Sequence, residues 1–329
     1  MPQWMLRYDL RTAAGIGAPH EELYAAALEQ CEWADRQGCP AILLPEHHGS
    51  VGGYLASPAV LGAGVAARTT RARIMVTDTV LRDPIARAED FAALDQLSGG
   101  RLDGLLTVGY VPEEFAMYGE QFDSRVRAFE EKADSLMRLL AGEEVYYRGR
   151  RATISPLPSQ QPRPPITFGG ATPAAARRSA AMADGFMPIV PDPGLVEAYE
   201  AECARLGREP RSYRHVRGAL AVLVVEDPER AWAELGKYIL DDMNTYGHWK
   251  AAEPGASPYY PAEDVETVRA SGLYSLVTPE ECVELMNRGP DGTTIFLHPL
   301  LAGIDPDVGW QSLHLFVDEV LPRLHDDSA

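Results

Sequence analysis

Short aliphatic segments alternate with amphipathic segments along nearly the whole chain, and this alternation limits the possible folds more than any other feature. Aliphatic runs of about four to eight residues predict buried strands, and longer segments with apolar residues three and four positions apart predict helices. Strands separated by helices run parallel in a sheet that the helices cover. We predict eight strands, over residues 5–9, 41–44, 73–79, 102–108, 166–168, 186–190, 216–225 and 293–297.

Helix signals follow each of these strands. Pro84 opens one helix and Gly99-Gly100 closes it, while Thr172 and Pro173 suit the N-cap and first position of another. Eight strand–helix pairs predict an α/β fold: a closed parallel TIM barrel, as a single domain over residues 1–329, with insertions at its C-terminal face. An open doubly wound sheet is the alternative. The helices are expected at residues 21–37, 58–68, 84–97, 126–140, 173–183, 194–206, 228–244 and 313–324.

A long segment after the seventh predicted strand and its helix is rich in aromatic residues, among them Tyr246 and Trp249. Loops longer than about 15 residues are commonly lids, binding loops or disordered segments. The aromatic content argues against disorder. We therefore expect a lid-like insertion over the C-terminal face at about residues 245–275.

Composition excludes several classes of partner. The 329 residues carry a formal net charge of −18 and no cluster of Lys or Arg, so nucleic acid and anionic membrane surfaces are unfavourable partners. The four cysteines are scattered, which favours free thiols in a reducing compartment. No signal peptide and no apolar run of about 20 residues is visible, so we expect a cytoplasmic protein.

The run Pro45-Glu46-His47-His48 directly follows the second predicted strand. The C-terminal ends of parallel strands are where α/β folds place their ligands and chemistry. A carboxylate and two imidazoles at that end are therefore candidate functional groups, although adjacent histidines in a loop can also be solvated polar residues. Their side chains diverge because they are adjacent, so we expect no metal site.

A second signal is the run Phe168-Gly169-Gly170-Ala171-Thr172-Pro173, where a strand ends in two glycines before a helix. Glycines allow a ligand close to the backbone, and the N-terminus of a helix attracts a phosphate group. An ordinary tight turn is the alternative. The run does not match the dinucleotide fingerprint, and the chain lacks a P-loop. Two further strand ends, at Gly109 and His298, could line the same mouth.

Taken together, ordered segments of the chain resemble the bacterial luciferase-like family of flavin-dependent oxidoreductases. The resemblance covers nearly the whole chain, and its specificity comes from the order of the pieces. The matching segments are residues 38–48, 94–101, 109–115, 165–173, 183–186 and 320–324.

This resemblance implies a barrel with a flavin in its C-terminal mouth, a lid after the seventh strand and a homodimer. Family members use reduced FMN and dioxygen, or the deazaflavin coenzyme for hydride transfer. The resemblance makes His47 the catalytic base and places the flavin phosphate near Gly169, Gly170, Ala171 and Thr172. It also places the flavin ring beside the third and fourth strand ends, at Thr77, Asp78, Thr79, Thr107, Gly109 and Tyr110.

One residue departs from the family pattern. Val108 stands where many members carry an arginine that helps hold the phosphate, and Arg177 or Arg178 could take its place. We hypothesise an FMN-dependent monooxygenase for a small organic substrate, supplied with reduced flavin by a separate reductase. Glu46 would orient the loop or the imidazole. The alternatives are a deazaflavin-dependent dehydrogenase or reductase and a non-catalytic flavin-binding protein. The substrate and lid side is assigned to His48, Tyr246, Trp249 and His298.

Overall fold

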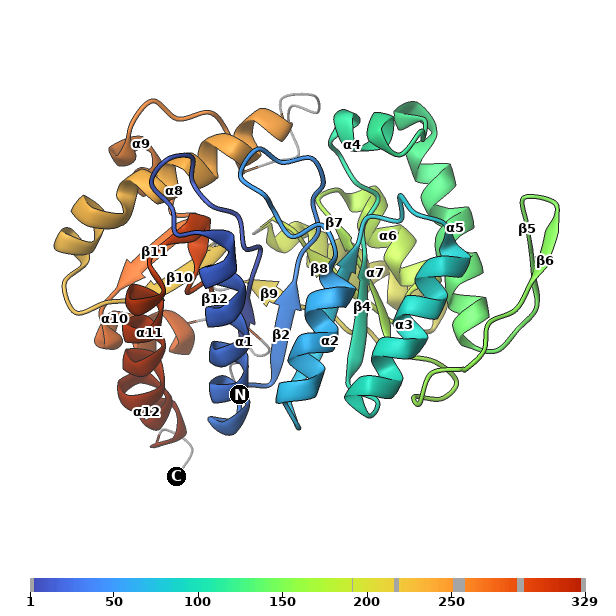
Figure 1. Cartoon of the computed structure of the whole chain (residues 1–329), viewed down its shortest axis with the longest axis horizontal. Helices are drawn as coiled ribbons and strands as arrows, with labels where there is room; N and C mark the ends of the chain where they lie inside the picture. Colours follow the sequence, from blue (N-terminus) through green and yellow to red (C-terminus); the bar gives the residue numbers. More distant parts are fainter. Residues whose placement is uncertain (1–2, 191, 216–218, 251–257, 289–292, 327–329) are drawn as a thin grey trace.

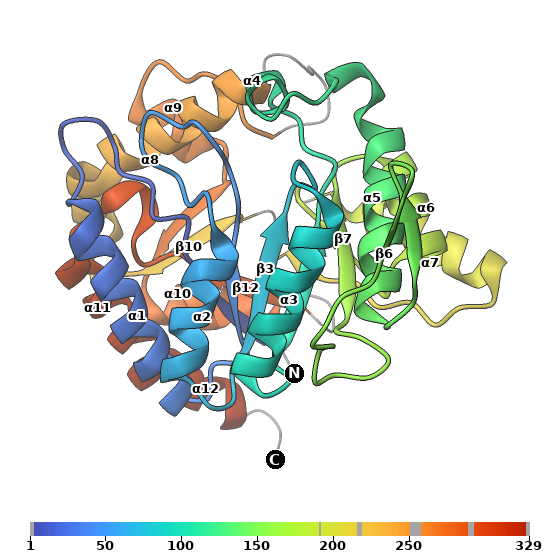
Figure 2. The same cartoon turned by 45° about the vertical axis from the view of Figure 1, so that its right-hand side comes forward.

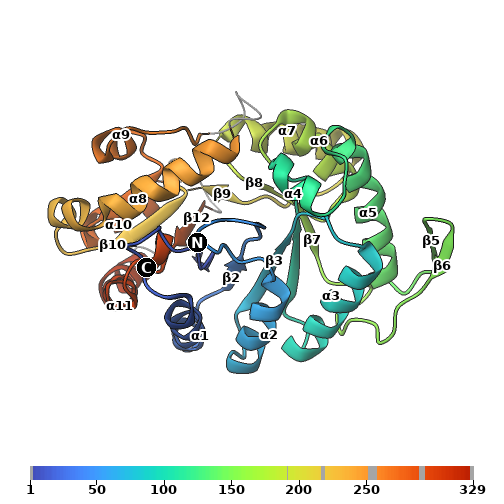
Figure 3. The same ribbon diagram turned by 45° about the horizontal axis from the view of Figure 1, so that its top comes forward.

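The computed structural model describes residues 3–190, 192–215, 219–250, 258–288 and 293–326. A ring of parallel strands stands at the centre, and helices surround it on the outside (Figures 1 and 3). The strands of the main sheet are β1 (Gln3–Arg7), β2 (Ala41–Leu44), β3 (Arg73–Asp78), β4 (Leu102–Leu106), β7 (Ile166–Gly170), β8 (Gly185–Pro188), β9 (Arg214–His215), β10 (Ala221–Val224), β11 (Tyr274–Val277) and β12 (Thr293–Leu297).

The pairing of these strands closes the barrel. Parallel pairs run from β12 through β1, β2, β3, β4 and β7 to β8. Phe186 of β8 then bridges to Ser212, and β9, which begins two residues after Ser212, pairs with β12. This contact joins the two ends of the sheet, as the eightfold alternation predicted, and excludes the open doubly wound alternative. Of the expected seventh strand, over residues 216–225, residues 221–224 form β10, and residues 216–218 lie outside the described part of the chain. Strand β9 lies just before the expected strand and was not predicted.

Ten α-helices accompany the strands within the described part of the chain, before the C-terminal helical segment. The expected caps are present at two of them: Gly99 has a φ of 65° after α3, and the Thr172 hydroxyl accepts the Ala175 N–H at the start of α6. The helices are α1 (His20–Arg36), α2 (Pro58–Arg68), α3 (Pro84–Ser98), α4 (Pro112–Met117), α5 (Arg125–Leu140), α6 (Pro173–Met182), α7 (Pro193–Leu206), α8 (Pro228–Lys250), α9 (Val265–Ala270) and α10 (Pro279–Asn287).

The C-terminal helical segment consists of α11 (Pro306–Leu315), a π-helical turn over Phe316–Val320 and α12 (Leu321–Asp326). It packs beside α1 on the outside of the barrel (Figure 1). The segment between α5 and β7 forms a two-stranded antiparallel hairpin of β5 (Val145–Tyr147) and β6 (Arg150–Ala152). This hairpin projects from the side of the molecule (Figures 1 and 3), and sequence periodicity did not predict it.

A layer of apolar side chains fills the barrel interior. Successive residues of a strand point to opposite faces, so every second residue points inward. The inward-facing cluster consists of one residue from each of six strands, and it forms the floor beneath the C-terminal mouth: Met5, Leu43, Met75, Leu105, Met187 and Phe296. Polar side chains continue above this floor on the same strands, among them Arg7 and Thr77.

The region expected to form a loop over residues 245–275 is partly helical. Helix α8 continues to Lys250 because Ile239, Met243 and Tyr246 extend its buried stripe at helical spacing. The expectation of a loop was therefore wrong for residues 245–250 and for α9, and Tyr274 begins strand β11. Residues 251–257 of the expected insertion lie outside the described residues. Helices α4, α8 and α9 lie at the C-terminal end of the barrel (Figures 1 and 2).

Candidate functional site

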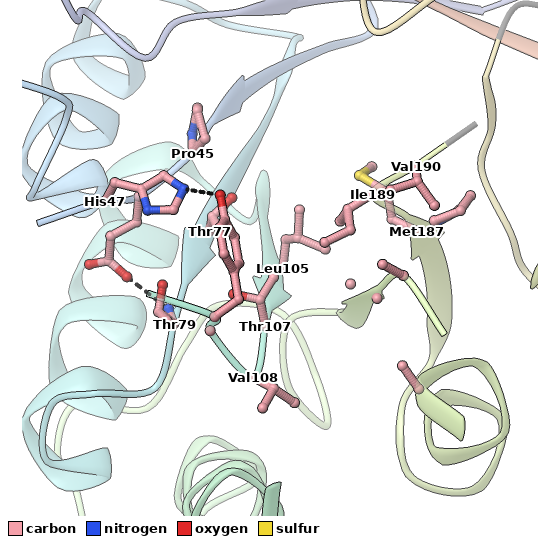
Figure 4. Close-up of a pocket in the computed structure, with 18 of the residues that line it drawn as sticks. Pro45, His47, Thr77, Thr79, Leu105, Thr107, Val108, Met187, Ile189 and Val190 are labelled. Atoms are coloured by element: carbon pink, nitrogen blue, oxygen red, sulfur yellow. Dashed lines mark hydrogen bonds between the residues drawn. The ribbon is translucent and has the colours of Figure 1, made fainter. Parts of the chain in front are cut away.

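The C-terminal mouth of the barrel contains a cavity of about 380 Å³. Its floor is apolar, and its walls come from the strand ends and from α5, α6 and α8. His47 lies at one side of this cavity, and Met187, Ile189 and Val190 lie at the opposite side (Figure 4). Twelve of the residues that the sequence placed in the site line it: Glu46, His47, Thr77, Thr79, Thr107, Gly109, Tyr110, Gly169, Gly170, Ala171, Thr172 and Tyr246.

His47 is held by hydrogen bonds at both ring nitrogens. Its Nδ1 lies 2.8 Å from Oε1 of Glu114, and its Nε2 lies 3.0 Å from the hydroxyl of Tyr110. The same Glu114 oxygen accepts the backbone N–H of His48, at 2.8 Å. A carboxylate oxygen accepts hydrogen bonds, so the imidazole donates to Glu114 through Nδ1. The ring hydrogen of His47 therefore lies on Nδ1. Burial raises the pKa of Tyr110 well above its usual value, so its phenol keeps its proton and donates it to Nε2.

Glu46 supports the strand end instead of the imidazole of His47. Its carboxylate accepts the backbone N–H of Thr79 at 2.8 Å and pairs with Arg87 at 2.7 Å. Arg87 is 1% exposed and also lies 3.3 Å from Asp78. His48 points into this same cluster and lies 3.4 Å from Glu46. Glu46 therefore ties the loop after β2 to β3 and α3, and the group that orients His47 is Glu114, which was not identified as its partner from the sequence.

An aromatic group covers the other side of His47. Trp249 stacks on the imidazole with ring centroids 4.4 Å apart, and Tyr54 contacts it edge-on at 4.8 Å. The Tyr246 and Tyr54 hydroxyls are 2.8 Å apart, and Arg7 donates to Tyr246 at 2.6 Å. Arg7 and Tyr54 were missed in the sequence. A signal was present for Arg7, because it is a charged residue inside the otherwise apolar run Met5-Leu6-Arg7-Tyr8.

The far end of the cavity is the N-terminus of α6. Ala171, Thr172, Ala174 and Ala175 line it, together with two cationic residues, Arg125 and Arg178. Arg178 extends from the second turn of α6 and pairs with Glu130 of α5 at 2.7 Å. Val108 lines the same cavity. Of the two arginines considered from the sequence, Arg178 lies at the cavity wall, whereas Arg177 is exposed and not part of that wall.

The three expected glycines have packing roles that the structure makes explicit. Gly109 has a φ of 80°, and a Cβ at this position would lie 2.5 Å from Thr79. A Cβ on Gly170 would lie 2.4 Å from Ala175, so this glycine allows the start of α6 to approach β7 closely. A Cβ on Gly169 would lie 2.9 Å from Thr107, at the cavity wall. All three positions thus require a residue without a side chain.

One residue of the cavity wall carries a buried polar atom without a partner among the described residues. The Thr77 side chain lines the cavity, and its buried Oγ1 has no hydrogen-bond partner among the described residues. Buried polar atoms are nearly always hydrogen-bonded in folded proteins. An unpartnered hydroxyl at a cavity wall therefore points to a bound molecule that supplies the missing hydrogen bond.

Four of the expected site residues do not line the cavity. Trp249 covers His47 from behind, and His48 faces Glu46 and the Tyr118 hydroxyl. Asp78 points away from the mouth toward Arg87 because it alternates with the inward-facing Thr77. His298 is 1% exposed and lies 3.2 Å from Asp9.

Neither a metal-binding group nor a membrane-spanning helix is found among the described residues. Within residues 3–326, apart from the undescribed gaps, no group of three or more His, Cys, Asp and Glu side chains is arranged to hold a metal ion. None of the helices that the structure describes has both the length and the apolar character needed to cross a bilayer.

Solved structures share this architecture over nearly the whole chain. Monooxygenase RslO1 from Streptomyces bottropensis superposes with a TM-score of 0.80 and 24% identity, covering 98% of this chain and 99% of RslO1. The oxygenating constituent of 3,6-diketocamphane monooxygenase from Pseudomonas putida, in complex with FMN, gives 0.75 and 17%, with the same coverage. An F420-dependent secondary alcohol dehydrogenase with an F420-acetone adduct gives 0.71 and 17%, again with the same coverage. At these identities the likeness establishes the fold alone.

Sequence comparison identifies the family. The uncharacterized protein y4wF of Sinorhizobium fredii (strain NBRC 101917 / NGR234) is 34% identical over 164 residues, which are 48% of this chain and 48% of y4wF. The chain thus matches about half the length of this curated relative. Residues 8–289 match the model of one family, described as luciferase-like monooxygenase. This match covers most of the chain and extends from the residue after β1 to just beyond α10. The chain belongs to the luciferase-like monooxygenase family.

Proposed function

We propose that this protein is a monooxygenase that uses reduced FMN and dioxygen to oxygenate a small organic substrate, with His47 as the base. The observation that carries the proposal is the position of His47. Its Nε2, held by Glu114 through the opposite nitrogen, faces the same cavity that ends at the N-terminus of α6. A base at one end and an anion-binding helix start at the other suit a phosphorylated cofactor beside a substrate.

The residues present fit FMN. The flat apolar floor suits an aromatic ring system, and the unpartnered Thr77 hydroxyl offers the ring a hydrogen bond. Arg178 and Arg125 supply positive charge at the far end, where the α6 N-terminus lies. Local donors of this kind are needed because the net charge of −18 repels an anionic ligand. Bound reduced FMN would supply the electrons that activate dioxygen.

The side chains around His47 provide a path for one proton. Tyr110 donates its hydroxyl hydrogen to Nε2, so a proton taken from a molecule in the cavity can pass through this hydroxyl to the imidazole. Glu114 then stabilises the positive charge that the imidazole acquires. A positioned base of this kind contributes roughly a hundred- to ten-thousand-fold to a rate. The rings of Trp249 and Tyr246 exclude water from this end of the cavity.

The decisive experiment combines cofactor binding with isotope transfer. Purified protein is titrated without oxygen with photoreduced FMN and, separately, with reduced F420. Oxygen labelled with ¹⁸O is then admitted in the presence of a panel of ketones, aromatic compounds and alkanes. Binding of reduced FMN with ¹⁸O in an organic product is the expected result. Hydride transfer from F420 without use of oxygen would contradict it, and flavin binding without any turnover would indicate a binding protein.

His47→Gln tests the role of the base in the same assay. The variant is expected to bind reduced FMN as the wild type does but to lose roughly a hundredfold or more of product formation. Oxygen uptake would then appear as hydrogen peroxide instead of labelled product. A variant with wild-type product yield would remove His47 from the base role.

The partners of this reaction are proposals as well. A separate reductase would supply reduced FMN, because Val108 leaves the phosphate without the arginine found in many members. This predicts a cofactor that exchanges freely, which dialysis of the loaded protein tests. We also propose a homodimer, which sedimentation measurements check, and a lid role for the region around residues 245–275, parts of which cover His47.

A further inference from the structure

Three polar side chains beside His47 form a hydrogen-bonded cluster at the wall of the cavity. Arg7 donates to the Tyr246 hydroxyl at 2.6 Å and lies 3.4 Å from the Tyr54 hydroxyl. The two hydroxyls are 2.8 Å apart, and both tyrosines are 5% exposed. All three residues line the cavity, and they come from β1, the loop after β2 and α8. The guanidinium and hydroxyl groups of the cluster take no part in the proton path assigned to His47.

One hydroxyl hydrogen of this cluster lacks a hydrogen-bond acceptor in the part of the chain that the structure describes. Arg7 can only donate, so both hydroxyl oxygens act as acceptors for it. The two tyrosines carry two hydroxyl hydrogens, and the bond between them uses one. Whichever tyrosine donates in that bond, the other hydrogen has no acceptor among the described residues. A buried donor without an acceptor is costly, so the cluster is built for a molecule that brings an acceptor into the cavity.

The charges around the cluster decide what kind of acceptor fits. Arg7 lies 3.8 Å from Asp9, and Arg11 pairs with Asp242 at 2.8 Å and with the partly exposed Asp241. Two buried guanidinium groups thus already face two buried carboxylates. An anionic ligand would add an unmatched buried charge, which is strongly unfavourable. A neutral acceptor adds none.

Among neutral acceptors, a carbonyl oxygen completes the cluster most simply. A carbonyl only accepts, whereas an alcohol brings another hydrogen that needs its own acceptor. The Tyr54 ring contacts the imidazole of His47, with centroids 4.8 Å apart, so a carbonyl bound here lies beside the base. We infer that Arg7, Tyr54 and Tyr246 form a subsite for the carbonyl oxygen of a neutral, largely apolar substrate. The inference rests on the proposed function only in taking this cavity as the substrate site.

The test measures binding, so it needs neither flavin nor turnover. The probes are cyclohexanone and methylenecyclohexane, which differ chiefly in the carbonyl oxygen. Their dissociation constants are measured on the purified full-length chain by tryptophan fluorescence, because Trp249 lies 5.9 Å from the Tyr54 ring. For each protein we take the ratio of the dissociation constant of methylenecyclohexane to that of cyclohexanone. The hydration of the two free probes is the same in every experiment, so its effect cancels when the ratios of two proteins are compared.

Tyr54→Phe and Tyr246→Phe together remove both hydroxyls with little change of shape. We expect the ratio to fall by about tenfold in this double variant, as the loss of one hydrogen bond to a buried acceptor predicts. Each single variant keeps one hydroxyl hydrogen free for the ligand, so each should lose less. Tyr238→Phe is the matched control, because Tyr238 lies on the same helix, bonds to Ile16 and does not line the cavity.

A vibrational measurement separates a bond to the carbonyl from a general change in the cavity. Cyclohexanone labelled with ¹³C at the carbonyl should show its stretching band at lower wavenumber in the wild type than in the double variant. An unchanged ratio or an unchanged band in the double variant overturns the inference, and so does a wild type that shows no saturable ketone binding. Reduced-FMN binding and ¹⁸O transfer stand apart from these readouts, so failure of the subsite and failure of the proposed function are distinguishable.

Discussion

The Nδ1 atom of His47 lies 2.8 Å from Oε1 of Glu114, although the two residues are 67 positions apart in the chain. The bond joins the loop after β2 to the first turn of α4, a six-residue helix at the mouth. It fixes the tautomer of the imidazole and leaves Nε2 facing Tyr110. The orientation of the proposed base is thus set by a short helix that follows a different strand.

Glu114→Gln is expected to lower the maximal rate of product formation roughly 10- to 100-fold while leaving reduced-FMN affinity within about twofold of wild type. The amide keeps the shape and an acceptor oxygen but not the charge that stabilises a protonated His47. Steady-state kinetics on the product of the ¹⁸O assay, with anaerobic FMN titration, gives both values.

Glu113→Gln provides the matched control, since Glu113 is the exposed neighbour of Glu114 at the start of the same helix. Its rate should equal the wild-type rate. Equal rates for both variants would show that Glu114 has no part in positioning the base.

Arg178→Met is expected to weaken FMN binding by about tenfold and to leave riboflavin binding unchanged. The side chain lines the cavity at the α6 N-terminus, where the phosphate is proposed to lie, and a charged hydrogen bond contributes about 1.5–3 kcal/mol. Flavin fluorescence titrations with FMN and riboflavin measure the difference. Arg177→Met is the control, because Arg177 precedes it on the same helix but is exposed. Equal losses of affinity for FMN and riboflavin would show that the phosphate does not bind at Arg178.

Thr77→Val tests whether the Thr77 hydroxyl serves ligand binding or the stability of the fold. Its buried Oγ1 has no partner among the described residues, so replacing it by a methyl group should leave the free energy of unfolding unchanged or slightly higher. FMN affinity should fall about three- to tenfold if the hydroxyl bonds to the flavin. Urea unfolding and flavin titration on the same preparation provide the comparison. A stability loss without an affinity change would mean that the hydroxyl serves the fold.

The barrel could be predicted from the sequence because its signals are local. The strands at Ala41–Leu44 and Thr293–Leu297 and the helix at Pro58–Arg68 were predicted with the observed limits, since aliphatic runs and proline or glycine boundaries mark them. The continuation of α8 through Tyr246 was missed because aromatic residues suggested a loop more strongly than the helical spacing suggested a helix. Hairpin β5–β6 was missed because its strands have only three residues each.

The site residues that stand at strand ends could be predicted from the sequence. His47 and the turn from Gly169 to Thr172 stand at strand ends, and a strand end can be located from the sequence alone. The partners of His47 cannot, because Glu114 and Trp249 reach it from α4 and α8 across long separations in the chain. Similarly, whether Asp78 faces inward depends on the register of β3, which places Thr77 in the mouth instead.

Acid should destabilise the protein through Asp9. Burial by itself raises the pKa of this carboxyl, but His298, Arg7 and Arg11 outweigh burial and hold its pKa below the usual value. A folded-state pKa below the unfolded value of about 3.9 means that the unfolded chain binds more protons in acid. The stabilisation is therefore complete above about pH 5 and decreases as the pH falls from there. Urea unfolding from pH 6 to pH 3 should show a shallower decline for Asp9→Asn than for wild type, and parallel curves would contradict this.

Gly109→Ala should strongly destabilise the protein, because it adds a methyl group at a crowded position of the cavity mouth. Gly109 adopts a φ of 80°, which L side chains rarely adopt, and its Cβ would lie 2.5 Å from Thr79 and 3.0 Å from the Phe115 ring. Gly149→Ala isolates the backbone component, because Gly149 has a φ of 75° and no atom within 4 Å of its would-be Cβ. Gly149→Ala should cost about 1–2 kcal/mol from strain, whereas Gly109→Ala should add roughly 1–3 kcal/mol from overpacking. Because Phe115 follows Glu114, the displaced ring should also disturb the bond to His47 and slow product formation. Equal stability losses for the two variants would show that the neighbours of Gly109 yield without cost.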